Sequence, residues 1–152
     1  EGRTDAWVLG SGVDARSRPD EVRAAMLGAL RSGAPAVVDA GALDLAAEAR
    51  GPIVVTPHDG ELRGVRIPLG LGVDDLEGED PLQDRLRRGF DERLLVARET
   101  AVALGGGLLP KGAVTIVAAR SEERRVWYEG TSSRATSHLI ITTLAPQSPR
   151  HH

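Results

Sequence analysis

Three short apolar runs mark the first third of the chain. Residues 6–9, 36–39 and 53–55 are rich in aliphatic side chains, and each run stops at a glycine, an aspartate or a Thr-Pro pair. Brief apolar runs bounded by turn residues are typical of buried strands. We therefore predict three strands in this part of the chain.

The stretches between these runs have the spacing of helices. Apolar side chains recur at helical intervals between Pro19 and Gly33, at positions 22, 26, 29 and 30. A shorter helix is predicted over residues 44–50. Strands that alternate with helices indicate a parallel sheet with helical crossovers, so the predicted fold class is α/β.

The second half of the chain is less regular. Gly64 and Pro68 weaken any helix that starts near Gly60, and residues 70–81 are rich in glycine and acid, which favours a loop. Residues 91–104 have the clearest helical pattern, with apolar side chains on one face and Gly105 at the end. A strand is predicted over residues 114–118, paired with residues 125–128 as a hairpin. We expect one domain over residues 1–144 and a disordered tail over residues 145–152.

Composition narrows the possible functions. The 152 residues carry a net charge of −3, which argues against general nucleic-acid binding because that needs a basic face. Cysteine is absent, so disulfides and thiolate metal sites are excluded. No apolar run approaches the length of a membrane span, and residues 1–5 do not resemble a signal peptide. We expect no membrane partner and a cytoplasmic location.

A glycine turn, Gly10-Ser11-Gly12, follows the first predicted strand. Glycines allow a ligand to approach backbone amides closely. Such turns also occur after strands that bind nothing, so the turn alone is a weak signal.

The segment Thr56-Pro57-His58-Asp59-Gly60-Glu61 follows the third predicted strand. It places an imidazole and two carboxylates at the carboxyl end of a strand, where open α/β sheets bind their ligands. The segment also suits a polar loop in which Thr56 or Asp59 caps a helix and Glu61 stabilises its positive end. The residues themselves leave both interpretations open.

A lysine-glycine pair lies in Pro110-Lys111-Gly112-Ala113-Val114-Thr115, which leads into a predicted strand. Lys111 could meet a phosphate as a point charge, although an exposed lysine at a strand edge has the same pattern.

Asp39, which closes the second strand, could be a ligand or cap the following turn. Acidic residues 74–80 lack the spacing of a calcium-binding loop, and we interpret them as solvated.

Taken in order, these segments resemble the ADP-dependent NAD(P)H-hydrate dehydratases of the ribokinase-like superfamily. That family has a Gly-Pro-Gly-type turn, a strand ending in Asp-Ala-Asp-Ala-Leu, a Thr-Pro-His-Pro-Gly-Glu loop and a Leu-Lys-Gly-x-x-Thr segment. The likeness runs from Ala6 to about Thr136, and the histidine loop is its most specific motif. It implies a three-layer α/β/α core with a mostly parallel sheet, incomplete in this chain.

The resemblance implies repair of NADH or NADPH whose nicotinamide ring has become hydrated. ADP phosphorylates the ring hydroxyl, and loss of phosphate restores the dinucleotide, with Mg²⁺ bridging phosphate oxygens. By this likeness Gly12 and His58 contact the hydrated dinucleotide. The residues that line the AMP part of the adenine nucleotide are Lys111, Gly112, Ala113, Val114 and Thr115. The likeness assigns no residue of this chain as a metal ligand, and it implies a homo-oligomer.

The chain departs from the family pattern most strongly near its end. The family continues after Leu-Ala-Thr with Gly-Ser-Gly-Asp or Gly-Thr-Gly-Asp, which supplies an anion hole and the Asp that acts as base. Here Arg134-Ala135-Thr136 is followed by no glycine and no aspartate. Ser11, Gly41, Asp59 and Pro110 also replace the usual residues of their motifs.

These departures make the chain resemble a truncated or degenerate copy, in which the catalytic residue is unknown and enzymatic activity is an open question. One alternative is a non-catalytic nucleotide-binding remnant. Another is a small-molecule kinase of the same superfamily, against which the histidine loop argues.

Overall fold

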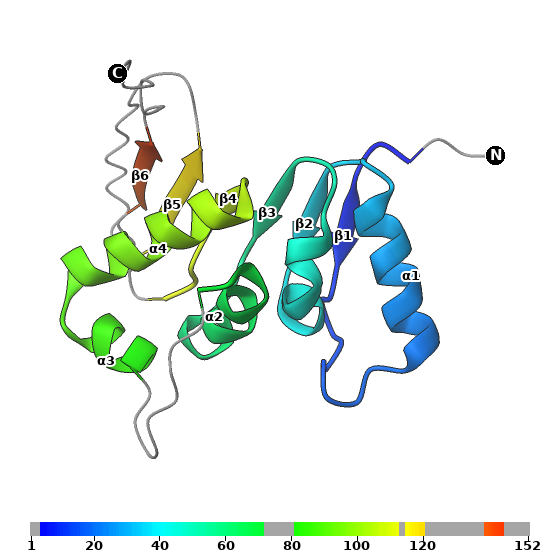
Figure 1. Ribbon diagram of the computed structural model, residues 1–152, viewed down its shortest axis with the longest axis horizontal. Helices are drawn as coiled ribbons and strands as arrows, with labels where there is room; N and C mark the ends of the chain where they lie inside the picture. Colours follow the sequence, from blue (N-terminus) through cyan, green and yellow to red (C-terminus); the bar gives the residue numbers. More distant parts are fainter. Residues whose placement is uncertain (1–3, 72–80, 113–114, 121–138, 145–152) are drawn as a thin grey trace, which may run out of the picture.

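The computed structural model describes residues 4–71, 81–112, 115–120 and 139–144, and within them one sheet contains six strands in sequential order. Strands β1 to β4 are mutually parallel, β5 is antiparallel to β4, and β6 is parallel to β5 (Figure 1). The α/β class with a mostly parallel sheet is therefore confirmed. The strands are β1 (Trp7–Leu9), β2 (Ala36–Val38), β3 (Ile53–Val55), β4 (Gly107–Leu108), β5 (Thr115–Arg120) and β6 (Leu139–Leu144).

The first crossover helix, α1 (Asp20–Arg31), confirms the helical spacing seen in the sequence. It starts directly after Pro19, and two acidic residues in its first turn complement the positive end of the helix. Its buried residues are Met26, Ala29 and Leu30, so the predicted apolar face is the face that joins the core.

The second crossover differs from the helix predicted over residues 44–50. It is a 3-10 helix, η1 (Ala40–Glu48), that starts four residues earlier. The earlier start has a local cause, because the Asp39 carboxylate accepts a hydrogen bond of 2.9 Å from the Ala40 amide. Gly41 then packs so closely that a Cβ there would lie 2.2 Å from the Val13 carbonyl oxygen.

Helix α2 (Asp59–Arg66) forms even though it contains Gly64 and lies close to Pro68. A capping box closes its first turn, and Leu62 and Val65 bury its apolar side. Pro68 lies just beyond the helix, in the short 3-10 turn η2 (Ile67–Leu69), which ends at Gly70.

Two further helices precede β4. Helix α4 (Phe90–Leu104) matches the predicted helix over residues 91–104, and Gly105 ends it in the left-handed conformation at φ +67°. Helix α3 (Pro81–Arg87) was not predicted. It buries Leu82 and Leu86, which are four residues apart and therefore lie on the same side of the helix.

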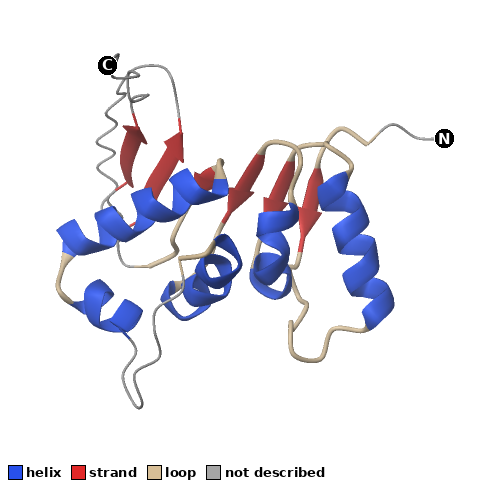
Figure 2. Cartoon of the chain, in the orientation of Figure 1, coloured by secondary structure: helices blue, strands red, loops and turns tan. Residues whose placement is uncertain are grey.

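The helices described here cover one face of the sheet. Sequential parallel strands joined by right-handed crossovers place their helices on the same side. All four α-helices and η1 accordingly share one apolar cluster with inward residues of the strands such as Val38, Val55 and Leu108, and Figure 2 draws α4 in front of β5.

The opposite face of the sheet carries exposed apolar residues. In the row of residues that pair across β1, β2 and β3, Val8 is 74% exposed and Val37 is 40% exposed. The residues described thus supply two layers of the three-layer α/β/α core that the resemblance implies.

Three predictions fall outside the described residues, namely the solvated acidic loop at 74–80, the hairpin with residues 125–128 and the tail at 145–152. Within the described residues β5 pairs with β4 and β6. None of the helices described is both long enough and apolar enough to cross a membrane.

Candidate functional site

The carboxyl ends of β1, β2 and β3 meet at one edge of the sheet, because these strands are parallel. Gly10 allows the loop after β1 to touch the loop after β2, since a Cβ on Gly10 would lie 1.9 Å from the Asp39 carbonyl oxygen. Gly12 has φ +74°, and a Cβ there would meet no atom within 4 Å. One glycine of the turn is therefore required by packing, whereas the other leaves space open.

A cavity of about 340 Å³ lies at this edge. The loop after β1, the start of η1 and residues 60–64 of α2 form its walls. Its lining residues are Val13, Asp14, Ala15, Arg16, Ala40, Gly41, Leu43, Asp44, Gly60, Glu61 and Gly64. Gly12 and His58 are next to this lining rather than part of it: Val13 follows Gly12, and Gly60 and Glu61 belong to the histidine loop.

His58 caps helix α2. Its Nδ1 atom accepts a hydrogen bond of 3.0 Å from the Gly60 amide, and its own amide donates to Glu61 Oε2 at 2.9 Å. Since Nδ1 is an acceptor, the proton of the neutral ring lies on Nε2, which is 3.4 Å from Glu61 Oε1. The expectation that Thr56 or Asp59 caps this helix was wrong, and the capping role belongs to the histidine.

Lys111 connects the ends of three strands. It pairs with His58 in an isolated parallel bridge, and its amide donates to the Pro57 carbonyl oxygen at 2.8 Å. Its ammonium lies 2.6 Å from Asp39 Oδ1 and 4.0 Å from Glu61 Oε2. The hydrogen bond from Lys111 is the main cause that holds the pKa of Asp39 below its ordinary value. Asp39 thus both caps η1 and pairs with Lys111.

The charged groups around Lys111 do not form an anion-binding site as they stand, because one ammonium faces two carboxylates. A phosphate can contact Lys111 only if the Asp39 side chain moves away or if the ligand brings its own cation. Among the described residues no three His, Cys, Asp or Glu side chains form a group suited to a metal ion. The residues described therefore do not fit a Mg²⁺ ion held by the chain itself, and no reaction step is assigned to one.

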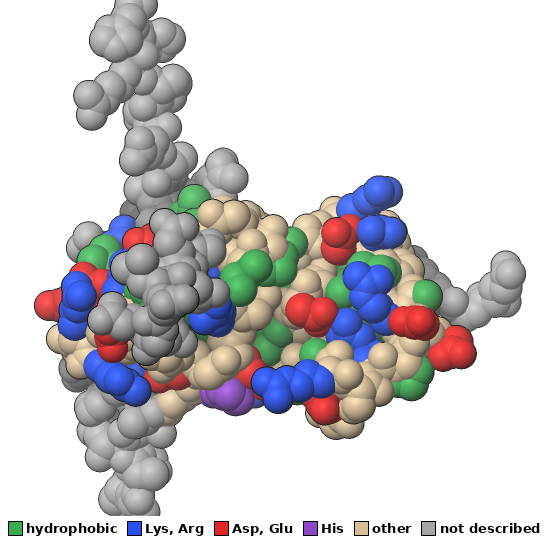
Figure 3. All heavy atoms as spheres, turned by 60° about the horizontal axis from the view of Figure 1, so that its bottom comes forward, with side chains coloured by type: hydrophobic (Ala, Val, Ile, Leu, Met, Phe, Trp, Pro, Cys, Tyr) green, Lys and Arg blue, Asp and Glu red, His purple; other side chains and the backbone are tan. Residues whose placement is uncertain are grey.

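The other predicted nucleotide residues are placed only in part. Gly112 is exposed beside Lys111, whereas Ala113 and Val114 lie outside the described residues. Thr115 opens β5 at the same edge, because β5 runs antiparallel to β4. Figure 3 turns this edge toward the reader and shows acidic and basic side chains intermixed over it.

Two arginines that the sequence did not single out fix the walls of the cavity. The Arg18 side chain is 3% exposed, binds the Gly41 carbonyl oxygen and holds the Asp44 carboxylate with two hydrogen bonds of 2.9 Å. These bonds lower the pKa of Asp44. Arg93 on α4 holds the Asp59 carboxylate with two bonds of 2.7 Å. The partners are 26 and 34 residues apart, so no local sequence pattern could reveal them.

A mostly parallel sheet with crossover helices and a cavity at its strand ends is the arrangement of an open α/β protein. The sequence profile described as NAD(P)H-hydrate dehydratase matches residues 1–137. This chain belongs to the NAD(P)H-hydrate dehydratase family.

Two relatives are the proteins named bifunctional NAD(P)H-hydrate repair enzyme Nnr from Mycobacterium tuberculosis strains CDC 1551 / Oshkosh and ATCC 25618 / H37Rv. Each is 36% identical over 125 residues, which cover 77% of this chain. The match spans only 22% of the length of each relative.

Proposed function

We propose that this chain carries the substrate contacts and part of the nucleotide contacts of an ADP-dependent NAD(P)H-hydrate dehydratase. The observation that supports this most directly is the convergence of Asp39, His58 and Lys111 at the carboxyl ends of adjacent parallel strands in a member of that family. In this proposal the hydrated dinucleotide contacts Gly12 and His58. The adenine nucleotide lies along residues 111–115 and brings Mg²⁺ with its phosphates.

The reaction of this proposal has two steps. The ring hydroxyl of the hydrated dinucleotide takes the terminal phosphoryl group of ADP, which leaves AMP. The carbon–oxygen bond then breaks, inorganic phosphate departs with the bonding electrons, and a ring proton is lost to restore the double bond. Lys111 would hold phosphate oxygens as a point charge, and the capped start of α2 would position the dinucleotide.

A specific observation favours a second candidate, a non-catalytic nucleotide-binding protein. Strand β6 occupies Leu139–Leu144, in the region where the family has a glycine turn that opens a helix. A strand presents no helix N-terminus to a phosphate. Under this candidate the chain binds ADP and NADPH but does not transfer phosphate.

Replacing Lys111 with alanine should weaken ADP binding roughly 10- to 100-fold, because a hydrogen bond to a charged group contributes about 1.5–3 kcal/mol.

Asp39→Asn should act in the opposite direction and tighten ADP binding, because it removes the carboxylate that competes with phosphate for the ammonium. Calorimetry with ADP measures both effects.

A direct probe of this contact is available, since Lys111 is the only lysine in the sequence. Reductive methylation with a ¹³C label would mark its side chain, and adding ADP should shift that signal in the NMR spectrum. A wild-type dissociation constant for ADP that Lys111→Ala leaves unchanged would contradict the nucleotide assignment.

The exposed face of the sheet favours assembly into a homo-oligomer. Val8 is 74% exposed on the edge strand β1, and exposed apolar patches beside open strand edges promote association. Val8→Lys should therefore shift the chain toward monomer in light scattering at high concentration. Val22→Lys is the matched control, because Val22 is 37% exposed on helix α1, away from that face. Equal masses for the wild type and Val8→Lys would count against this surface.

A further inference from the structure

Gly64 lines the cavity from the middle of helix α2, and nothing in the described residues requires a glycine there. Glycine is the least favourable helix residue after proline. The backbone of Gly64 is not in the left-handed region, and a Cβ at this position would meet no atom within 4 Å. Gly41, on the opposite wall, is different, because a Cβ there would lie 2.2 Å from the Val13 carbonyl oxygen. The space beside Gly64 is therefore open cavity rather than packed interior.

Arg16 lines the same cavity, and its charge has no partner in the part of the chain that the structure describes. The Asp14 carboxylate fixes the turn by accepting bonds from the Arg16 amide at 3.0 Å and the Ser17 hydroxyl at 3.1 Å. The structure gives the Arg16 guanidinium no hydrogen bond or ion pair within the described residues. Nearby cations differ in this respect, since Arg18 and Lys111 are each paired with a carboxylate.

The acidic side chains of the cavity already have partners. Asp44 is held by Arg18, Glu61 accepts from the His58 amide, and Asp14 holds its own turn. Among the described residues, an entering ligand thus meets one charged group of the cavity lining without a partner, the Arg16 guanidinium. A planar guanidinium with free N–H groups matches phosphate oxygens in a two-point contact.

We propose that this cavity binds a phosphate-bearing half of the dinucleotide, with Arg16 paired to the phosphate and Gly64 leaving room for the attached sugar. This inference rests on the proposed function and adds two residues to its substrate site. The cavity of about 340 Å³ lies at the small end of ligand sites, which are roughly 300–1,000 Å³, so it suits one half of a dinucleotide rather than the whole.

The test compares four variants by calorimetry with NADPH and with ADP, and by thermal melting without ligand. Gly64→Leu should weaken NADPH binding at least tenfold because the side chain fills the cavity, and Arg16→Gln should weaken it about tenfold and reduce its salt dependence. Gly64→Ala should raise the melting temperature of the free chain. Gly28→Leu is the matched control, since Gly28 is also a helical glycine whose Cβ would meet nothing within 4 Å, but it lies on α1 outside the cavity.

The outcomes separate this inference from the proposed function. If the wild type binds NADPH and both Gly64→Leu and Arg16→Gln bind it equally well, the cavity assignment is overturned while the proposed function stands. If the wild type binds neither NADPH nor ADP, both are overturned. Unchanged ADP affinity in the two cavity variants, with weakened NADPH affinity, supports the assignment and places the nucleotide elsewhere. Because Arg16 is exposed, its variant keeps the test valid even if Gly64→Leu fails to fold.

Discussion

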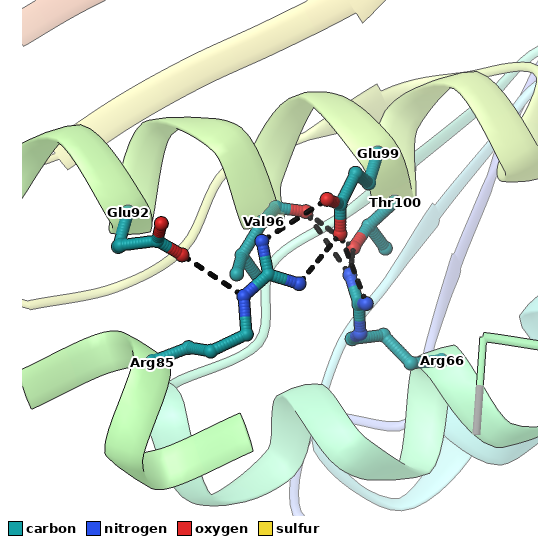
Figure 4. Close-up of polar contacts among 6 residues, drawn as sticks. All are labelled: Arg66, Arg85, Glu92, Val96, Glu99 and Thr100. Atoms are coloured by element: carbon teal, nitrogen blue, oxygen red, sulfur yellow. Dashed lines mark hydrogen bonds and ion pairs between the residues drawn. The ribbon is translucent and has the colours of Figure 1, made fainter. Parts of the chain in front are cut away.

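Replacing Glu99 with glutamine should lower the free energy of unfolding by about 3 kcal/mol, the lower end of the cost of breaking a buried ion pair. Arg66 is 7% exposed at the end of α2, and Glu99 on α4 is its counter-charge at 3.1 Å (Figure 4). The guanidinium also donates to Thr100 Oγ1 at 2.7 Å and to the Val96 carbonyl oxygen at 3.2 Å. Glutamine leaves these hydrogen bonds but removes the charge that compensates a buried cation, and it also weakens the two bonds of 3.0 Å that Arg85 donates to Glu99. Since Glu99 is 42% exposed, water screens part of the loss.

Glu92→Gln is the matched control on the same helix. Glu92 contacts Arg85 at 2.9 Å, and Arg85 is 27% exposed, so water can replace the lost partner. The expected cost is within about 1 kcal/mol, as for other surface ion pairs. Urea unfolding of the two variants measures the difference. Equal destabilisation by the two substitutions would show that burial of Arg66 does not set the cost.

The ion pairs of Glu99 with Arg85 and Arg66 give a pH dependence of stability with a definite sign. Hydrogen bonds from Arg85 and then from Arg66 lower the pKa of Glu99 in the folded chain. The stabilisation is therefore complete above the ordinary glutamate pKa, roughly 4.3, and is lost as the pH falls through the lower folded-state value. Glu99→Gln should flatten this part of the acid unfolding curve.

The spacing of apolar residues along the sequence predicted three strands and two helices of the fold. Strands β1 to β3, helix α1 and helix α4 each have an apolar run or a helical stripe that decides their type. Helix α3 was missed because its seven residues follow a stretch rich in glycine and acid, and only two buried leucines mark it. The bounds of η1 were missed because they depend on the Asp39 cap and on the contact of Gly41 with Val13.

The candidate site was predictable as a set of segments, but not as a set of contacts. The sequence placed Gly12, His58 and Lys111 after or before strands, and parallel pairing brings those positions to one edge. It gave no sign that Lys111 pairs with Asp39, because 72 residues separate them. Arg18 and Arg16 look alike in the sequence, and only the fold shows that Arg18 is buried in an ion pair, whereas Arg16 is exposed with no partner among the described residues.

The chain alone should not restore hydrated NADH at the rate of an intact dehydratase. Losing a positioned general base costs about 10²–10⁴-fold in rate. Losing a preorganised donor to the developing negative charge costs roughly 10²–10³-fold more. The family pattern places both in a Gly-x-Gly-Asp turn, and residues 137–152 of this chain contain neither glycine nor aspartate. In the described residues this region instead contributes strand β6, whose backbone groups pair with β5.

The measurement is the return of nicotinamide absorbance when purified chain is incubated with hydrated NADH, ADP and Mg²⁺, beside an intact dehydratase as positive control. We expect no turnover above the uncatalysed rate, together with measurable ADP binding. His138 is the titratable side chain nearest to the missing aspartate, so His138→Ala is assayed in parallel. Turnover near that of the positive control would contradict the prediction, and its loss in His138→Ala would identify a replacement base. Activity that appears only after a Gly-Ser-Gly-Asp segment is grafted after Thr136 would trace the lost activity to the absence of this turn.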